Sequence, residues 1–176
     1  MLIDAATNRQ WGACYSDERL AELYDHPHTL TEVLTRDDGR WADVPIIDRL
    51  WVFFRAVTPT TLNEFLARML ERLKDAGKLT DPRSLAVIPA LRSGTMTQEI
   101  IDAAYAADAT AIIATGNATA AAFAAHAAWK DARATFRFAS ATTVASLAAR
   151  SIGVACDATE RSRQLADAIE LASKAT

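Results

Sequence analysis

The residues best suited to metal chemistry lie together at Asp25, His26 and His28, where a proline separates the two histidines. That proline keeps both imidazoles off a helix, and a structural zinc site normally needs four ligands. A further ligand would have to come from Cys14 or Asp37. We therefore predict a polar turn between two helices, with no bound metal and no cofactor.

The two cysteines, Cys14 and Cys156, lie far apart and form no CxxC pattern, which argues against a zinc knuckle, a redox dithiol or a disulfide framework. The sequence places no histidine or carboxylate as a partner for Cys14, so we predict a small buried apolar residue rather than a nucleophile. The chain also lacks GxxxxGK(S/T), HExxH, GxSxG and GxGxxG patterns. We predict that the protein is not an enzyme.

One acid has a position of interest. At 100° per residue, Asp108 falls between Ile101, Tyr105 and Ile112 on the face that carries the large apolar groups of its helix. A buried carboxylate there would serve a helical-bundle enzyme or small-ligand binder, together with His126 or Tyr105.

The alternative has this helix turned so that small and branched residues face inward and Asp108 lies at the border. Those inward residues would be Ile100, Ala104, Ala107 and Ala111. We prefer this alternative, because isolated acids in helical bundles are usually structural or exposed.

Four basic residues recur at the spacing i, i+4, i+7 and i+11, which places them on one side of a continuous helix beside Trp129. They are His126, Lys130, Arg133 and Arg137. We predict that this basic stripe binds an acidic protein partner, because four charges would give only weak, salt-dependent binding to nucleic acid. The alternative is a solvated helix face balanced by acids such as Asp131.

The chain of 176 residues is 51% hydrophobic and 23% charged with a net charge of -3, which is ordinary for one globular domain over residues 1–176. Residues 1–94 are rich in aromatic side chains, and 22 of the 50 residues from 101 to 150 are alanine. Alanine favours helices and lets their axes approach closely. We see no signal peptide and no apolar run of about 18 residues, so we expect a cytoplasmic protein with no membrane partner.

Capping residues and glycines divide the chain into helices. The predicted helices are Ser16–Tyr24, Thr29–Thr35, Pro45–Ala56, Pro59–Ala76, Pro82–Ser93 with a kink near 84–87, Thr97–Thr115, 117–152 with a break near 140–143, and Asp157–Lys174. The sequence therefore predicts an all-α fold, a helical bundle of seven or eight helices with an alanine-rich C-terminal half.

The helices at 45–56 and 59–76 each carry an apolar stripe, so we expect them to form an antiparallel pair. The stripes are Ile47, Leu50, Trp51 and Phe54 on the first helix and Leu62, Leu66, Met69 and Leu73 on the second. Trp51 is therefore predicted to be core. Trp11 and Trp41 lie in polar, loop-like sequence, where an aromatic side chain belongs either to the core or to a binding surface.

The succession YSDERL (15–20), DRLWVFFR (48–55) and DPRSLAVIPALRSG (81–94), followed by alanine-rich helices, resembles a family of bacterial immunity proteins associated with toxin and mobile-element loci. The resemblance covers about residues 14–150 and carries no catalytic residue. It implies a non-enzymatic interaction protein, or a phage or mobile-element inhibitor, that acts by occluding a partner. A ligand binder or enzyme using Asp108 and a structural homo-oligomer remain the alternatives.

Overall fold

The computed structural model describes residues 1–37, 39–111 and 157–174, and the all-α prediction is confirmed. In chain order the elements are β1 (Leu2–Ile3), α1 (Ala5–Gln10), α2 (Asp17–Leu23), β2 (His28–Thr29), α3 (Leu30–Thr35), the 3-10 turn η1 (Gly39–Trp41), α4 (Ile46–Ala56), α5 (Pro59–Asp75), α6 (Pro82–Leu85), α7 (Val87–Ser93), α8 (Gln98–Ala111) and α11 (Asp157–Lys174). None of the helices in these ranges has the length and apolar character that crossing a membrane requires.

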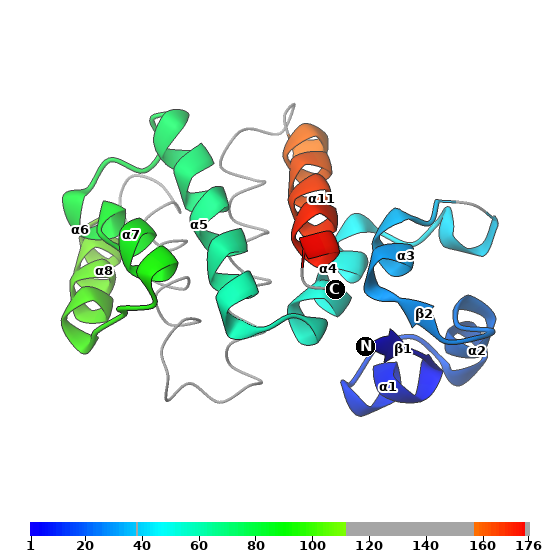
Figure 1. Cartoon of the computed structure of the whole chain (residues 1–176). Helices are drawn as coiled ribbons and strands as arrows, with labels where there is room; N and C mark the ends of the chain where they lie inside the picture. Colours follow the sequence, from blue (N-terminus) through cyan, green and yellow to red (C-terminus); the bar gives the residue numbers. More distant parts are fainter. Residues whose placement is uncertain (38, 112–156, 175–176) are drawn as a thin grey trace.

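Figure 1 shows how these elements are arranged. Helices α6, α7 and α8 lie at one end, α5, α11 and α4 occupy the middle, and α1, α2, α3 and the two short strands form the other end. Helix α5 packs along α7, while α11 packs against α3, α4 and α5. The strands pair antiparallel, with Ile3 opposite His28, and so tie the N-terminus to the segment before α3.

The predicted helix starts are set by local caps. The side chains of Ser16 and Thr58 accept hydrogen bonds from backbone N–H groups in the first turns of α2 and α5. Thr29 and Glu32 form a reciprocal capping box at the start of α3. Because each cap needs only residues within three positions, the sequence alone located these starts.

The kink predicted near 84–87 is present as a break at Ala86, which separates α6 from α7. Pro89 is the third residue of α7 and has no N–H to donate to the preceding turn. Helix α7 then ends at Gly94, whose φ of 66° is left-handed and favours glycine.

The larger hydrophobic core lies between α4, α5, α7, α8 and α11. At its centre Phe53 and Phe54 of α4 pack against Phe65 of α5, with ring centroids 5.2 and 5.4 Å from that ring. All four stripe residues predicted on α5 are buried. Burial of one such side chain stabilises the fold by about 1.5–3 kcal/mol.

The predicted antiparallel pairing of α4 with α5 is wrong. The two helices meet through the phenylalanines near their junction, but α5 lies along α7, and α4 lies against α3 and α11. Helix α4 is buried on more than one side, because Leu50 and Phe54 enter the larger core while Val52 enters a second cluster. A single apolar stripe therefore understated how much of α4 is enclosed.

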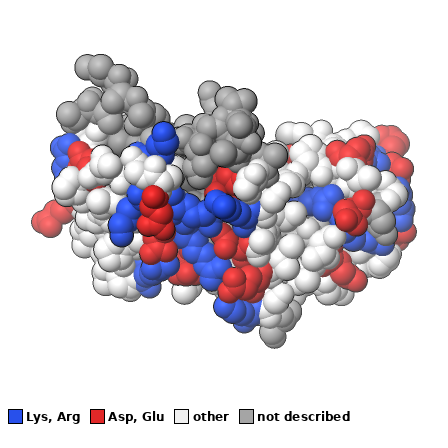
Figure 2. All heavy atoms as spheres, turned by 90° about the horizontal axis from the view of Figure 1, so that it is seen from above, with Lys and Arg blue, Asp and Glu red and all other residues white. Residues whose placement is uncertain are grey.

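Ion pairs also join α5 to α7, through Arg92 and Glu71, and α5 to α11. Arg68 contacts Asp167 at 3.1 Å and Glu170 at 2.9 Å, and Arg72 contacts Asp167 at 2.5 Å. Figure 2 shows positive and negative side chains interleaved over the middle of the face it displays. Because charges of both signs are mixed on this face, we interpret them as ion pairs that hold neighbouring helices together.

Candidate ligand-binding pocket

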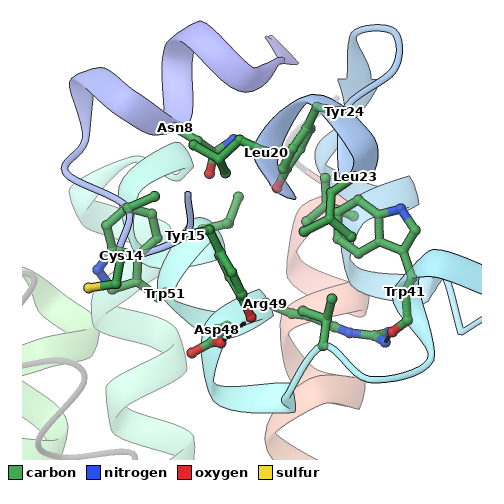
Figure 3. Close-up of a pocket in the computed structure, with 14 residues that line it drawn as sticks. Asn8, Cys14, Tyr15, Leu20, Leu23, Tyr24, Trp41, Asp48, Arg49 and Trp51 are labelled. Atoms are coloured by element: carbon green, nitrogen blue, oxygen red, sulfur yellow. Dashed lines mark hydrogen bonds between the residues drawn. The ribbon is translucent and has the colours of Figure 1, made fainter. Parts of the chain in front are cut away.

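A second hydrophobic cluster at the N-terminal end encloses a pocket of about 200 Å³. Its walls come from α1, the segment after α1, α2, α3, η1 and α4 (Figure 3). Buried apolar side chains form much of the lining, namely Leu20, Leu23, Val33, Val44 and Val52. An engineered apolar cavity of about 150 Å³ holds benzene, so this space suits a molecule the size of a two-ring aromatic.

Aromatic rings complete the wall. Trp41 is 2% exposed and packs edge-on against Tyr24, with centroids 5.3 Å apart. On the other side Trp51 lines the pocket and meets Trp11 edge-on at 6.4 Å. In Figure 3 the six-membered ring of Trp41 is turned toward the pocket beside Leu23. Such rings offer flat apolar surfaces against which an aromatic ligand stacks or packs edge-on.

A polar pair marks one part of the pocket. The hydroxyl of Tyr15 donates a hydrogen bond to Asp48 Oδ2 at 2.6 Å (Figure 3). Burial and the neighbouring Asp48 carboxylate raise the pKa of Tyr15, so Tyr15 stays a neutral donor. The Asp48 carboxylate thus already accepts a hydrogen bond from a side chain of the protein.

Tyr24 brings a second hydroxyl to the pocket. Burial raises the pKa of Tyr24 to about 12, and the nearby side chain of Asn8 partly opposes the shift. Asn8 is itself buried and donates from Nδ2 to the backbone oxygen of Asp4 at 2.9 Å. Figure 3 shows the Tyr24 hydroxyl directed inward from α2. The group therefore provides a neutral polar atom among apolar walls.

Arg49 is the most unusual lining residue, because it is a cation with only 6% of its surface exposed. Its Nη2 donates to the backbone oxygen of Trp41 at 2.7 Å. Its buried Nε has no hydrogen-bond acceptor within the protein, and the negative charge of Asp37 offsets part of its burial. Burial lowers the pKa of Arg49, although a guanidinium remains charged at neutral pH.

Cys14 lines the same pocket but is exposed, with a free thiol. The prediction that it is a buried apolar residue is wrong, because the segment after α1 carries it to the protein surface. Cys14 therefore belongs both to the pocket lining and to the protein surface.

The burial of the tryptophans differs from the prediction. Trp41 is core, whereas Trp51, predicted as core, and Trp11 are only partly buried and pack at the edge of the cluster. The guanidinium of Arg55 lies over the Trp51 ring, 4.9 Å from its centroid. The loop-like sequence around Trp41 hid its burial, since η1 depends on tertiary contacts.

The burial of side chains on α8 tests the two orientations predicted for the helix that carries Asp108. Ala104 and Ala107 are buried and Tyr105 is 37% exposed, as expected if the alanine face is turned inward. Ile101 is also buried. The side chain of Asp108 lies outside the described residues, so its predicted place at the border stays a prediction.

The basic stripe lies wholly outside the described residues. Its members, together with the flanking tryptophan, are His126, Trp129, Lys130, Arg133 and Arg137. Binding of an acidic protein by these residues therefore stays a prediction.

The polar turn predicted at Asp25, His26 and His28 lies between α2 and β2, and its three side chains are close together. His28 is buried, so one imidazole of this polar turn lies inside the protein. Its ring packs against Tyr24 and Trp41, both of which line the pocket. The turn is therefore part of the same N-terminal structure as the pocket.

Comparison with protein-family models, curated proteins and solved structures finds no match to this chain.

Proposed function

We propose that the protein binds a small aromatic carboxylate in the N-terminal pocket. The observation that carries the proposal is Arg49, a buried cation that lines an apolar cavity and whose buried Nε has no hydrogen-bond acceptor within the protein. A buried charge with few partners is costly, and a carboxylate is the group that a guanidinium binds best. The cavity of about 200 Å³ and its aromatic walls fit the rest of such a ligand.

The other polar groups are consistent with this ligand. The Asp48 carboxylate accepts a hydrogen bond from Tyr15, which lessens its repulsion of an incoming anion. The Tyr24 hydroxyl is neutral and supplies no opposing charge. The ligand's rings would replace water against Leu20, Val52 and Trp51, and each square ångström of apolar surface so buried contributes about 25 cal/mol.

Calorimetric titration of the full chain with 2-naphthoate tests the proposal, with the neutral isostere 2-naphthamide as the ligand control. We expect 2-naphthoate to bind with one site per chain and at least about tenfold more tightly than 2-naphthamide, because only the acid forms a charged hydrogen bond with Arg49.

The matched variants are Arg49→Met, which keeps an unbranched apolar stem and removes the guanidinium, and Arg163→Met on the exposed side of α11. Arg49→Met should remove the preference for the acid, while Arg163→Met should bind as the wild type does. Equal binding of acid and amide by the wild type, or an unchanged preference in Arg49→Met, would refute the proposal.

Occlusion of an acidic protein partner, as the immunity-protein resemblance implies, is retained as a separate hypothesis. No residue in the described ranges bears on it, since the basic stripe lies between residues 126 and 137. Large exposed hydrophobic side chains in the described part of the chain are Met1, Leu2 and Tyr105. The pocket is therefore the better supported starting point.

A further inference from the structure

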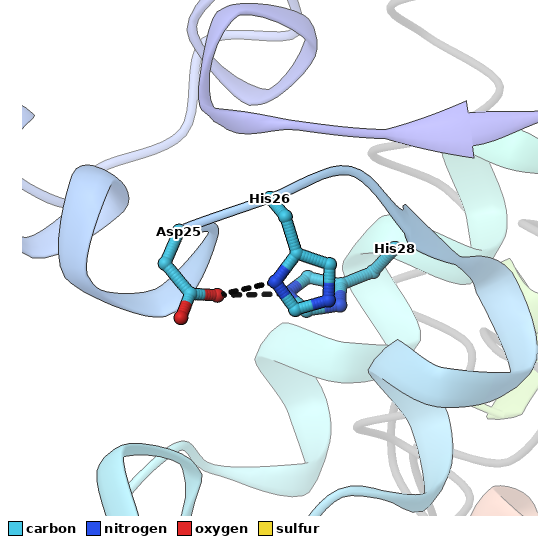
Figure 4. Close-up of side chains that lie close together, drawn as sticks. All are labelled: Asp25, His26 and His28. Carbon is cyan, nitrogen blue, oxygen red and sulfur yellow. Dashed lines mark ion pairs between the residues drawn. The ribbon is translucent and has the colours of Figure 1, made fainter.

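The turn between α2 and β2 brings three ligand-type side chains together. Asp25, His26 and His28 come from four successive positions, and one donor atom of each lies within 4.8 Å of the others. Figure 4 shows the Asp25 carboxylate directed at the two imidazole rings, which overlap in the view. The ring centroids of His26 and His28 are 4.2 Å apart. The proline that keeps these histidines off a helix thus places both rings on one side of the turn.

The spacing of the donors suits a small metal ion. Asp25 Oδ1 lies 2.8 Å from His26 Nδ1 and 3.8 Å from His28 Nε2. Donors at about 2.0–2.2 Å from a tetrahedral zinc ion are about 3.3–3.6 Å from one another. The observed distances lie on both sides of this range. Because Asp25 and His26 have exposed side chains, small rotations bring them to the ideal spacing.

His28 and Asp25 are held in place by contacts outside the cluster. His28 is buried between Tyr24 and Trp41, and its Nε2 lies 3.2 Å from the backbone oxygen of Leu23. The same Nε2 faces Asp25 Oδ1, so an ion bound there takes the place of the contact with the Leu23 oxygen.

Asp25 is oriented in the same way, from its other oxygen. Its Oδ2 accepts a hydrogen bond from Arg40 Nη2 at 2.7 Å, while Oδ1 faces the histidines. Partners of this kind hold metal ligands in position, and their loss typically weakens metal binding about 10–100-fold. Arg40 therefore turns the Asp25 carboxylate toward the two histidines before an ion arrives.

The surrounding charges are mixed. Arg36 Nη1 lies 3.2–3.4 Å from both ring nitrogens of His28, and Arg40 pairs with Asp25. The carboxylate of Glu32 is close enough to interact with both histidines and offsets part of this positive charge. An ion is therefore held mainly by its bonds to the donor atoms, which favours a metal that binds imidazole well over magnesium or calcium.

We propose that Asp25, His26 and His28 bind a divalent transition-metal ion of the zinc class. Two imidazoles and one carboxylate are a donor set that such ions accept, and a fourth position stays open to water. The ion joins the end of α2 to β2 and braces the wall that holds Tyr24 and Trp41.

The test is calorimetric titration of tag-free protein with Zn²⁺, repeated with Co²⁺, whose visible absorption reports ligation. We expect one ion per chain and a thermal midpoint that rises with added Zn²⁺ and returns with a chelator. His26→Ala should weaken binding by at least about tenfold. His28 is left intact because its burial against Trp41 makes a folding defect the expected result of its removal.

The control variant His126→Ala removes the chain's third histidine and should bind Zn²⁺ as the wild type does. Asp25→Asn provides a second variant of an exposed ligand and should also bind less tightly. Wild-type protein that takes up no Zn²⁺, or a His26→Ala variant with unchanged affinity, overturns the inference. Since no aromatic acid is present, either result is independent of the ligand proposed for the pocket.

Discussion

Arg49 carries a positive charge in a place where most of its neighbours are apolar. It shares a face of α4 with Val52 and Phe53, three and four positions later, and all three are buried. The hydrogen bond to Trp41 satisfies one end of the guanidinium and leaves Nε without an acceptor. A bound carboxylate would offset the cost of keeping this charge inside the folded protein.

Enlarging a side chain should destabilise the protein less beside the pocket than in the closed core. Val52→Leu adds one methylene beside a cavity, so we expect the free energy of unfolding to change by less than about 0.5 kcal/mol. Val87→Leu, in the fully buried part of α7, should cost about 1–3 kcal/mol because no space is available. Urea denaturation measures both, and equal costs would mean that the pocket is closed in solution.

Among the elements, α11 depends on α5 for more than apolar contact. Glu160 near its start is 1% exposed, and Arg72 Nε donates to Glu160 Oε1 at 3.0 Å. A buried carboxylate of this kind requires a charged partner. The ion pairs therefore fix the position of α11 against α5, while the buried alanines and leucines of α11 supply most of the attraction.

Removal of one partner tests this arrangement. Arg72→Met leaves Glu160 buried without its cation, so we expect a loss of about 3 kcal/mol in the free energy of unfolding. Arg9→Met breaks a pair with the exposed Asp17 and should cost less than about 1 kcal/mol. Chemical denaturation of the two variants gives the comparison, and similar small losses would show that the α5–α11 pairs are not structural.

The same network predicts a pH dependence. Arg68, and then Lys174, hold the pKa of Glu170 at about 2, below its ordinary value of 4.5. Because the unfolded chain binds this proton more readily, the stabilisation is complete above about pH 4.5 and is lost as the pH falls toward about 2. Thermal midpoints of Glu170→Gln should therefore vary less with pH in this window than those of the wild type. Parallel curves would exclude Glu170 as a contributor.

Across the whole molecule, local signals predicted the helices and failed to predict their partners. Caps such as Ser16 and the pair Thr58–Pro59 lie within one turn of the helices they start. Local signals did not identify α7 as the partner of α5, because α4 and α7 both carry apolar faces and only tertiary packing determines which one lies along α5. Short elements such as α1 and the two-residue strands were missed because they have no period to detect.

The pocket could not be predicted from the sequence patterns either. Its lining runs from Asn8 to Val52 and belongs to elements whose contacts are set by the tertiary fold. One signal was available, because Arg49 interrupts the apolar run from 45 to 54 on a face that would otherwise be buried. A charged residue at such a position indicates either a helix edge or a buried group that needs a partner.

Charge reversal tests the hypothesis that the basic stripe binds an acidic protein. Arg133→Glu combined with Arg137→Glu reverses half of the predicted basic stripe, so an acidic partner should be lost in pull-downs from the native host lysate. The wild type and the pair Arg161→Glu with Arg163→Glu on α11 serve as controls. If the folded stripe variant keeps every partner of the wild type, the stripe is only a solvated helix face.

The central claim is that an aromatic acid lies in the N-terminal pocket with its carboxylate on Arg49. A crystal structure of the protein with 2-naphthoate tests this most directly, because it locates both ends of the ligand. We predict the rings among Leu20, Val52 and Trp51, and a carboxylate oxygen about 2.7–2.9 Å from a nitrogen of the Arg49 guanidinium. A ligand bound elsewhere, or a carboxylate that is turned to solvent and makes no contact with the Arg49 guanidinium, would contradict the claim.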